Sequence, residues 1–243
     1  MRGTEIDFGI QTAVGKPPWP RRAILAFTRM ELGILREMRT GGREGRPLME
    51  GLTQVRFWPD LVLAGPMLGA PQAAMVMETL GRRGVREFLS LGWCGSLQPG
   101  LGWGRVILPL SAFCEEGTSA HYRLEGPPAG ADPRLSGRLA ESLRARGVDF
   151  TSGRVWTTDA PFRETREKVR EYGNQGLLAV DMETSALMSV ARFRDWSWAG
   201  LLVVSDELWG ERWRPGFQSP ELKAGLVSAA EVLTDVFGGW EVE

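Results

Sequence analysis

Short apolar runs with the pattern of strands alternate with runs that have helical spacing along almost the whole chain. The expected strands are 23–27, 60–65, 86–92, 105–109, 148–158, 177–182 and 199–206. The expected helices are 29–39, 71–83, 133–147, 163–173, 183–193 and 220–237. Such alternation predicts an α/β fold, with a central sheet and helices outside it.

The pattern starts at Arg22, and no linker, repeat or low-complexity tract divides it. We therefore expect one domain over 22–243, preceded by an extended N-terminal arm over 1–21 that contains three prolines, Pro17, Pro18 and Pro20. The N-terminal segment has no signal-peptide layout, and no apolar run approaches the ~20 residues of a membrane helix. We predict a cytoplasmic protein without a membrane partner.

Composition argues against several classes of function. The chain has 243 residues and a net charge of −1, so it has no global field that would recruit nucleic acid. Cys94 and Cys114 could form one disulfide, but two buried thiols in a reducing compartment are the favoured interpretation. The single histidine, His121, argues against a zinc site, and we expect no metal and no cofactor.

Polar side chains follow four of the predicted strands. They are Asp159, the pair Asp181 and Glu183, and the pair Ser205 and Asp206, together with glycines 92 and 95. A carboxylate just beyond a buried strand must be paired, cap a helix or bind a ligand. Capping explains any one of these acids. Four strand ends together favour a shared pocket, because ligands of α/β sheets collect at the carboxyl ends of the strands.

The predicted turn that contains Gly92 and Gly95 lacks the G-x-G-x-x-G order, and no helical pattern follows it. Dinucleotide binding is therefore disfavoured. Two alternatives remain, which are a close approach of the backbone to a small ligand and a simple tight turn.

The stretches "VDMETSAL", "VVSDEL" and "LGWCGSLQPGLGWGRVILP" resemble motifs of the nucleoside phosphorylase/nucleosidase superfamily. The segments "EEGTSAHY" and "TTDAPFRET" are similar to its phosphorylase branch, and the resemblance runs from Ala23 to the end. It implies a central mixed, twisted β-sheet flanked by helices. It also implies cleavage of the N-glycosidic bond of a nucleoside, with a purine the expected base.

The resemblance also implies roles for individual residues. Glu183 would accept hydrogen bonds from the ribose hydroxyls, and Met182 would pack against the sugar. Asp206 would be the general acid for the departing base, and Ser205 would orient it. A fifth residue, Phe162, would stack on the base, with plain core packing as its alternative.

Two positions of this group have a second interpretation. The alignment around Phe162 leaves Pro161 as an alternative stacking residue. Asp181, next to the sugar-binding pair, is interpreted as a helix cap.

The half of the site that would hold phosphate or water, the molecule that accepts the sugar, departs from the family pattern. Positions that bind phosphate in the family's phosphorylases correspond to Ala26 or Phe27, Ser90 and Trp93, so the usual arginine is absent. Glu31 falls where the family's nucleosidases have the glutamate that activates water, with an exposed helix acid as the alternative.

Two acceptors therefore stay open, phosphate as a co-substrate and water. Arg29, Arg56 and Arg163 could build a different anion site. The rival functions are a non-catalytic nucleoside-binding homologue and a nucleotide-cofactor oxidoreductase. The resemblance further implies a homo-oligomer, either a dimer or a hexamer.

Overall fold

The structure is a computed structural model that describes residues 19–125 and 129–237. Residues 1–18, most of the predicted arm, lie outside the described residues. Trp19 is buried and packs edge-on against Phe57, with ring centroids 4.6 Å apart. The last residues of the proposed arm are thus part of the fold, and the boundary at 21/22 stays a prediction.

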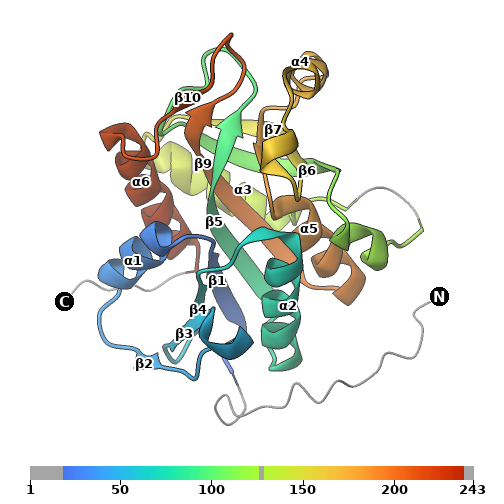
Figure 1. Cartoon of the computed structure of the whole chain (residues 1–243). Helices are drawn as coiled ribbons and strands as arrows, with labels where there is room; N and C mark the ends of the chain where they lie inside the picture. Colours follow the sequence, from blue (N-terminus) through green and yellow to red (C-terminus); the bar gives the residue numbers. More distant parts are fainter. Residues whose placement is uncertain (1–18, 126–128, 238–243) are drawn as a thin grey trace.

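The elements follow one another in the alternation that the sequence predicts (Figure 1). The strands are β1 (Arg22–Ala26), β2 (Arg43–Glu44), β3 (Gln54–Phe57), β4 (Leu61–Gly65), β5 (Glu87–Ser96), β6 (Val106–Cys114), β7 (Phe150–Thr157), β8 (Ala179–Asp181), β9 (Ser197–Glu207) and β10 (Arg214–Pro215). The α-helices are α1 (Arg29–Met38), α2 (Gly69–Arg82), α3 (Pro133–Ala145), α4 (Arg166–Asn174), α5 (Thr184–Arg194) and α6 (Pro220–Phe237). Short 3-10 turns are η1 (Met49–Gly51), η2 (Thr118–Tyr122) and η3 (Pro161–Arg163).

All of these strands belong to one mixed sheet with the order β10-β9-β6-β7-β8-β5-β1-β4-β3-β2, and β9 also pairs with β5. The extra pairing closes β5, β9, β6, β7 and β8 into a ring of hydrogen-bonded strands. The remaining strands extend from it through β1. The fold class predicted from the sequence, an α/β domain with a mixed sheet, is confirmed.

Strand register brings three of the four predicted strand-end groups together, whereas Asp159 accepts from the backbone N–H of Gly117 at 3.0 Å. In the parallel pair of β5 and β9, Gly95 lies opposite Asp206, with a bulge between Cys94 and Gly95. Gly95 also lies opposite Val180 of β8, and Asp181 lies opposite Thr157 of β7. The ends of four strands thus converge at one edge of the ring.

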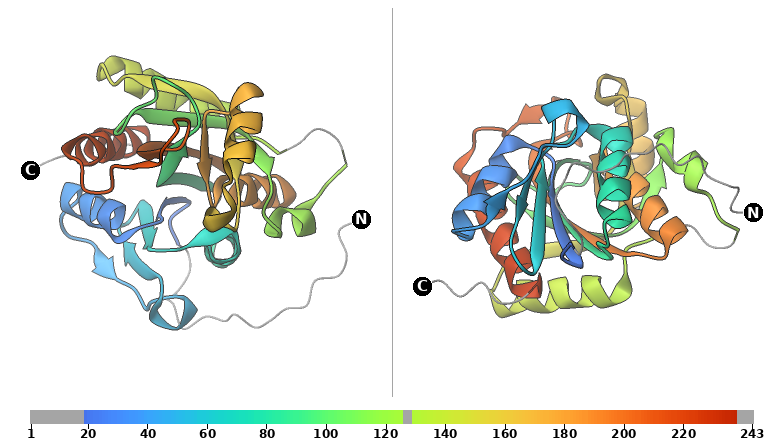
Figure 2. Two further views of the ribbon diagram at one scale, coloured as in Figure 1. Left: turned by 45° about the horizontal axis from the view of Figure 1, so that its top comes forward. Right: turned by 90° about the horizontal axis from the view of Figure 1, so that it is seen from below.

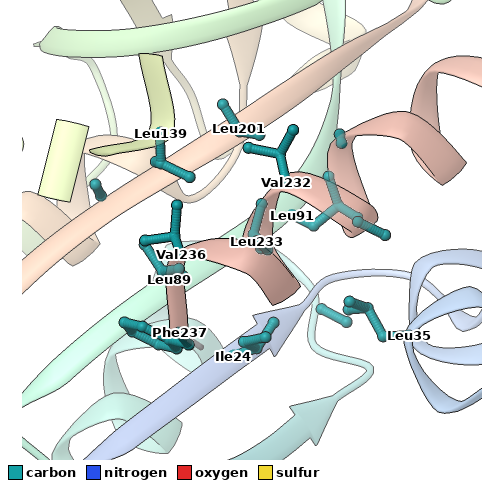
Figure 3. Packing of buried hydrophobic residues seen from close by; sticks show 14 of the residues in the cluster. Ile24, Leu35, Leu89, Leu91, Leu139, Leu201, Val232, Leu233, Val236 and Phe237 are labelled. Atoms are coloured by element: carbon teal, nitrogen blue, oxygen red, sulfur yellow. The ribbon is translucent and has the colours of Figure 1, made fainter. Parts of the chain in front are cut away.

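Helices cover both faces of the sheet, and each face has its own apolar core. Helices α1, α3 and α6 pack on one face, and α2 and α5 pack on the other (Figure 2). Figure 3 shows α6 on the first face, with Leu233 and Phe237 among Ile24 of β1, Leu89 of β5 and Leu201 of β9. This three-layer packing fixes the strands that carry the polar edge.

The structure corrects one predicted turn. Gly92 and Gly95 lie inside strand β5, which continues to Ser96. The strand continues because β9 is long enough to pair with it as far as Ser96 and Glu207. Both glycines are needed for close packing, since a Cβ on Gly92 would lie 2.4 Å from the Phe27 ring and one on Gly95 would lie 2.7 Å from Leu208.

Candidate active site

A cavity of about 520 Å³ opens at the polar edge of the ring. Segments from the β1–α1 turn, the β4–α2 loop, β5, η3, the β8–α5 junction, β9 and the β10–α6 loop line it. The lining residues used below are Thr28, Trp93, Gly95, Pro161, Phe162, Glu164, Asp181, Met182, Glu183, Ser205, Asp206, Trp213 and Phe217. The cavity therefore contains Met182, Glu183, Phe162, Ser205 and Asp206, all of which the resemblance places in the site.

Glu183 is buried at the start of α5, with 6% of its surface exposed. It occupies the N-cap position of the helix, but its side chain makes no capping hydrogen bond. Its Oε1 atom instead accepts a hydrogen bond from the backbone N–H of Gly69 at 2.7 Å. Burial, and next the charge of Asp181, raise the pKa of Glu183 to about 8.

Asp181 does the capping that its neighbour does not. Its Oδ2 atom accepts from the backbone N–H of Thr184 at 2.8 Å and of Glu183 at 3.3 Å, and its Oδ1 atom accepts from the Thr157 hydroxyl at 2.6 Å. Burial raises the pKa of Asp181, while these hydrogen bonds act in the opposite direction. The sequence interpretation of Asp181 as a helix cap agrees with this geometry.

Asp206 lies at the end of β9 with donors on both carboxylate oxygens. The Ser205 hydroxyl donates to Oδ1 at 2.7 Å, and the Trp213 indole N–H donates to Oδ2 at 2.8 Å. Ser205 is buried, and its hydroxyl also lies 3.2 Å from the carbonyl oxygen of Cys94. Ser205 thus contacts the carboxylate that it is predicted to orient, and the role itself stays a prediction.

Glu31 is not an exposed helix acid, because its side chain is fully buried in α1. It lies behind the cavity wall and is not among the residues that line it. The hydroxyl of Thr28, a lining residue, donates to its Oε2 atom, and Oε1 makes no hydrogen bond with the described residues. Burial raises the pKa of Glu31 to about 8, although backbone N–H groups and the nearby Trp93 indole act to lower it.

Phe162 lies at the mouth of the cavity and is completely exposed, so core packing does not explain it. Its neighbour Pro161, the alternative stacking residue, lines the same mouth. Gly95 lines the cavity and Gly92 does not. A Cβ on Gly95 would lie 3.2 Å from Oδ2 of Asp206, so the backbone of β5 closes one side of that carboxylate.

Sequence reasoning missed Glu164 and Trp213. Glu164 follows η3 and lines the cavity, and burial together with the charge of Asp206 raises its pKa to about 7. The raised pKa and the concave position are typical of functional carboxyl groups. A signal for Glu164 was present in the segment "TTDAPFRET", where it lies two residues after Phe162. No pattern in the sequence pointed to Trp213.

The ionisable groups that line the cavity among the described residues are acidic, apart from the thiol of Cys94. Among the described lining residues, Glu164, Asp181, Glu183 and Asp206 carry carboxyl groups, and none is lysine, arginine or histidine. The arginines considered for an anion site, Arg29, Arg56 and Arg163, are not among the residues that line it. Arg56 lies 3.5 Å from Glu44 at the far edge of the sheet.

Other predicted features lie outside the cavity. His121 is in η2 and does not line it. Both cysteines are free thiols, as expected, but only Cys94 is buried, and Cys114 is exposed at the end of β6. The described residues contain no cluster of three or more His, Cys, Asp or Glu that could hold a metal ion. Among the described helices, none combines the length and apolarity of a membrane span.

Solved structures of nucleoside phosphorylases have the same fold as this chain. Purine nucleoside phosphorylase from Toxoplasma gondii, in complex with immucillin-H, superimposes with a TM-score of 0.81 over 90% of each chain, at 20% identity. Uridine phosphorylase from Vibrio fischeri ES114 gives a TM-score of 0.74 over 88% of this chain and 92% of its own, also at 20% identity. The fold is that of the nucleoside phosphorylases.

The sequence itself gives the family. The family model of the phosphorylase superfamily matches residues 21–232, and the chain belongs to this superfamily. This confirms the family that the motifs indicate.

Relatives by sequence carry related names. A guanosine phosphorylase of Halorubrum lacusprofundi is 32% identical over 133 residues, which is 55% of this chain and 55% of that protein. A DeoD-type purine nucleoside phosphorylase of Bacillus thuringiensis is 29% identical over 165 residues, 66% of this chain and 69% of its own length. The chain thus aligns with little more than half of the first relative's length.

Proposed function

We propose that this protein cleaves the N-glycosidic bond of a purine nucleoside and releases the free base. The observation that carries the proposal is the placement of Glu183 and Asp206 in one cavity, each at a strand end and each held by a hydrogen bond from another segment. The names of the sequence relatives, guanosine phosphorylase and purine nucleoside phosphorylase, support a purine as the base.

The two carboxyl groups suit opposite ends of a nucleoside. As the bond from the sugar to the base breaks, electrons move to the base and positive charge develops on the sugar. Asp206 would give a hydrogen bond or a proton to the ring nitrogen of the departing base. Glu183 would accept hydrogen bonds from the ribose hydroxyls and stabilise the cationic sugar. Burial raises the pKa of Glu183 to about 8, and the positive charge that develops on the sugar would act in the opposite direction and favour the ionised form.

Glu164 would complete the base end of the site. It lies close enough to Asp206 that the Asp206 charge raises its pKa, so the two face the same region of the cavity. With a pKa of about 7, Glu164 can either donate or accept a hydrogen bond at neutral pH. We propose that it contacts the edge of the base beside Asp206. Phe162, at the mouth, would cover the base face once substrate is bound.

Phosphate is the acceptor that the relatives' names favour. Water is a second candidate, and one observation favours it, namely that the described cavity lining holds four carboxyl groups and no cationic side chain. A phosphate dianion would find no arginine in this lining to hold it. Glu31 would activate water only by way of a rearrangement of Thr28 or Trp93, because those residues lie between it and the cavity.

A panel of nucleosides assayed with and without phosphate tests the proposal and decides the acceptor. Release of free purine is followed by absorbance and by chromatography of the sugar product. Dependence on phosphate with formation of a sugar 1-phosphate supports phosphorolysis. Unchanged release in phosphate-free buffer, abolished by Glu31→Gln, supports hydrolysis. Absence of base release from every nucleoside in both buffers contradicts the proposed function and leaves a nucleoside-binding homologue.

Two further predictions go with this function. We propose a homo-oligomer, either a dimer or a hexamer, which light scattering of the purified protein would test. We also propose a cytoplasmic location, which cell fractionation would test. A monomer in solution would contradict the first, and recovery of the protein with membranes would contradict the second.

A further inference from the structure

We infer that Trp213 is a positioning residue that fixes the Asp206 carboxylate for its role at the departing base. The inference rests on the proposed function. It starts from the indole N–H of Trp213, which donates to Oδ2 of Asp206 at 2.8 Å. Indole is a donor only, and its hydrogen bond would strengthen as Asp206 gives up a proton, because a bond to an ionised carboxylate is about twice as strong as one between neutral groups.

The carboxylate is held on three sides. Trp213 donates to one oxygen and Ser205 to the other, so rotation about the bond to the carboxyl group is blocked. The backbone of Gly95 approaches so closely that even a methyl group there would lie 3.2 Å from Oδ2. Asp206 therefore presents a fixed edge to the cavity, and this edge depends on the donor from Trp213.

Several hydrogen bonds hold the hairpin on which Trp213 lies. Strands β9 and β10 form a hairpin in which Arg214 pairs with Glu207 and Pro215 with Asp206. The N–H of Gly216 donates to the carbonyl oxygen of Ser205 at 2.8 Å. The Trp103 indole donates to the carbonyl oxygen of Arg214 at 3.2 Å. The residues that follow Trp213 are thus tied to β9 and to the β5–β6 turn.

Aromatic contacts hold the indole ring as well. Phe217 lies 5.9 Å from Trp213 and stacks on Trp93 of β5 at 5.9 Å, so the three rings form a continuous aromatic wall of the cavity. Trp213 is nevertheless 57% exposed. Packing alone does not require its polar N–H to point at the candidate acid, and this direction is what assigns it a role through Asp206.

Substitution of Trp213 by phenylalanine keeps a ring in the wall and removes only the donor. Loss of a hydrogen bond to a charged group corresponds to roughly ten- to hundredfold in rate when the interaction acts in the transition state. We expect Trp213→Phe to lower kcat by about that factor on a purine nucleoside, with KM changed much less. Trp213→His, which restores a ring N–H, should recover part of the loss. Trp209→Phe on the same hairpin is the matched control, because Trp209 does not line the cavity.

A double-mutant cycle shows whether Trp213 acts through Asp206. In the Asp206→Asn background the further change Trp213→Phe should cost little, since the partner is already altered. An equal loss of kcat in both backgrounds would overturn the inference. A higher KM with unchanged kcat would also overturn it. That result would mean that Trp213 contacts bound substrate as part of the cavity wall and does not position Asp206.

A measurement that needs no activity separates this inference from the proposed function. In protein with ¹⁵N-labelled tryptophan, the indole N–H resonance that disappears in Trp213→Phe belongs to Trp213. The hydrogen bond to the Asp206 carboxyl oxygen should place this resonance downfield, and Asp206→Ala should move it upfield. An unmoved resonance in Asp206→Ala would refute the contact itself, whether or not the protein releases a base.

Discussion

Two acidic residues separated by one position, Asp181 and Glu183, have different partners in this fold. Asp181 uses its side chain to cap α5, and it also accepts from Thr157 of the neighbouring strand. Glu183 occupies the N-cap position but directs its carboxylate to Gly69 and the cavity. The strand that ends at Asp181 and the helix that starts at Thr184 place these acids side by side, which leaves only Glu183 available for a ligand.

This division predicts the behaviour of Glu183→Gln, which keeps the shape of the side chain and removes its charge. Charged hydrogen bonds are worth roughly 1.5–3 kcal/mol, so kcat/KM on a ribonucleoside should fall by about one to two decades. The loss on the matching 2′-deoxynucleoside should be smaller, because one of the two hydroxyl contacts is already missing.

The control for this measurement is Glu141→Gln, which changes an exposed acid of α3. Above pH 8 the melting temperature of Glu183→Gln should stay the same or rise, because there the substitution replaces an ionised, buried carboxylate with a neutral group. Equal kinetic losses on the two sugars would remove Glu183 from the sugar site.

The residues that sequence reasoning could predict are those next to regular elements. Glu183 and Asp206 come at the ends of strongly apolar strands, so their place at the sheet edge was predictable. Glu164 and Trp213 come from a 3-10 turn and a hairpin, where no periodic pattern exists, and they reach the cavity only through tertiary pairing.

Helix α1 shows a further limit of sequence reasoning. The spacing predicts an apolar face made of Met30, Ile34, Leu35 and Met38, and Leu35 is fully buried as expected. Met30, however, is 38% exposed, and Leu32 and Glu31 are buried outside the predicted face. A buried carboxylate inside a helix cannot be told from a surface acid by spacing alone.

At the scale of elements, the α5 cap joins three pieces of the fold. Asp181 is the last residue of β8. Its carboxylate accepts one hydrogen bond from the N-terminus of α5 and another from the Thr157 hydroxyl of β7. The Thr157 oxygen in turn accepts from the backbone N–H of Ser185 at 3.1 Å. The network fixes the junction on which Glu183 and Met182 lie.

Asp181→Ala should therefore lower thermal stability. A lost cap costs about 0.5–2 kcal/mol, and 1 kcal/mol shifts the melting temperature of a protein of this size by about 2–4 °C. Asp181→Asn, which keeps an acceptor oxygen, should lose less than Asp181→Ala. Differential scanning calorimetry measures both. A melting temperature of Asp181→Ala equal to that of the wild type would show that the cap contributes nothing.

The alternation of elements was predictable, and the closure of the sheet was not. Helix α6 has the bounds 220–237 that its apolar spacing predicts. The short strands β2, β3 and β10 were missed, because two to four polar or mixed residues do not form a recognisable pattern. The ring arises because β6 pairs with β9 in the antiparallel direction and β9 with β5 in the parallel direction, a choice that no local sequence signal encodes.

At the scale of the whole molecule, the fold buries several carboxyl groups with raised pKa values. Glu31 and Glu183 have pKa values of about 8, and Glu164 has one of about 7. An acid with a raised pKa binds more protons in the folded state than in the unfolded state. Its contribution to stability is fully present below the unfolded pKa of about 4.5 and is lost as the pH rises through the folded value.

Stability should accordingly fall as the pH rises from about 5 to about 8. Melting temperatures measured across this window should decrease, and Glu31→Gln should reduce the slope because it removes one of the titrating groups. A melting temperature that rises from pH 5 to pH 8 would mean that these carboxyl groups are ionised in the folded protein.

The central claim is that Asp206 assists the departure of the base while Glu183 holds the sugar. The most direct test compares Asp206→Asn with the wild type on two substrates that share ribose, a purine nucleoside and 4-nitrophenyl riboside. General acid catalysis is typically worth about 10²-fold or more, and nitrophenolate leaves without a proton. We predict a loss of that size in kcat on the nucleoside and a small loss on the nitrophenyl riboside. Equal losses on the two substrates, or near-native turnover of the nucleoside, would contradict the account.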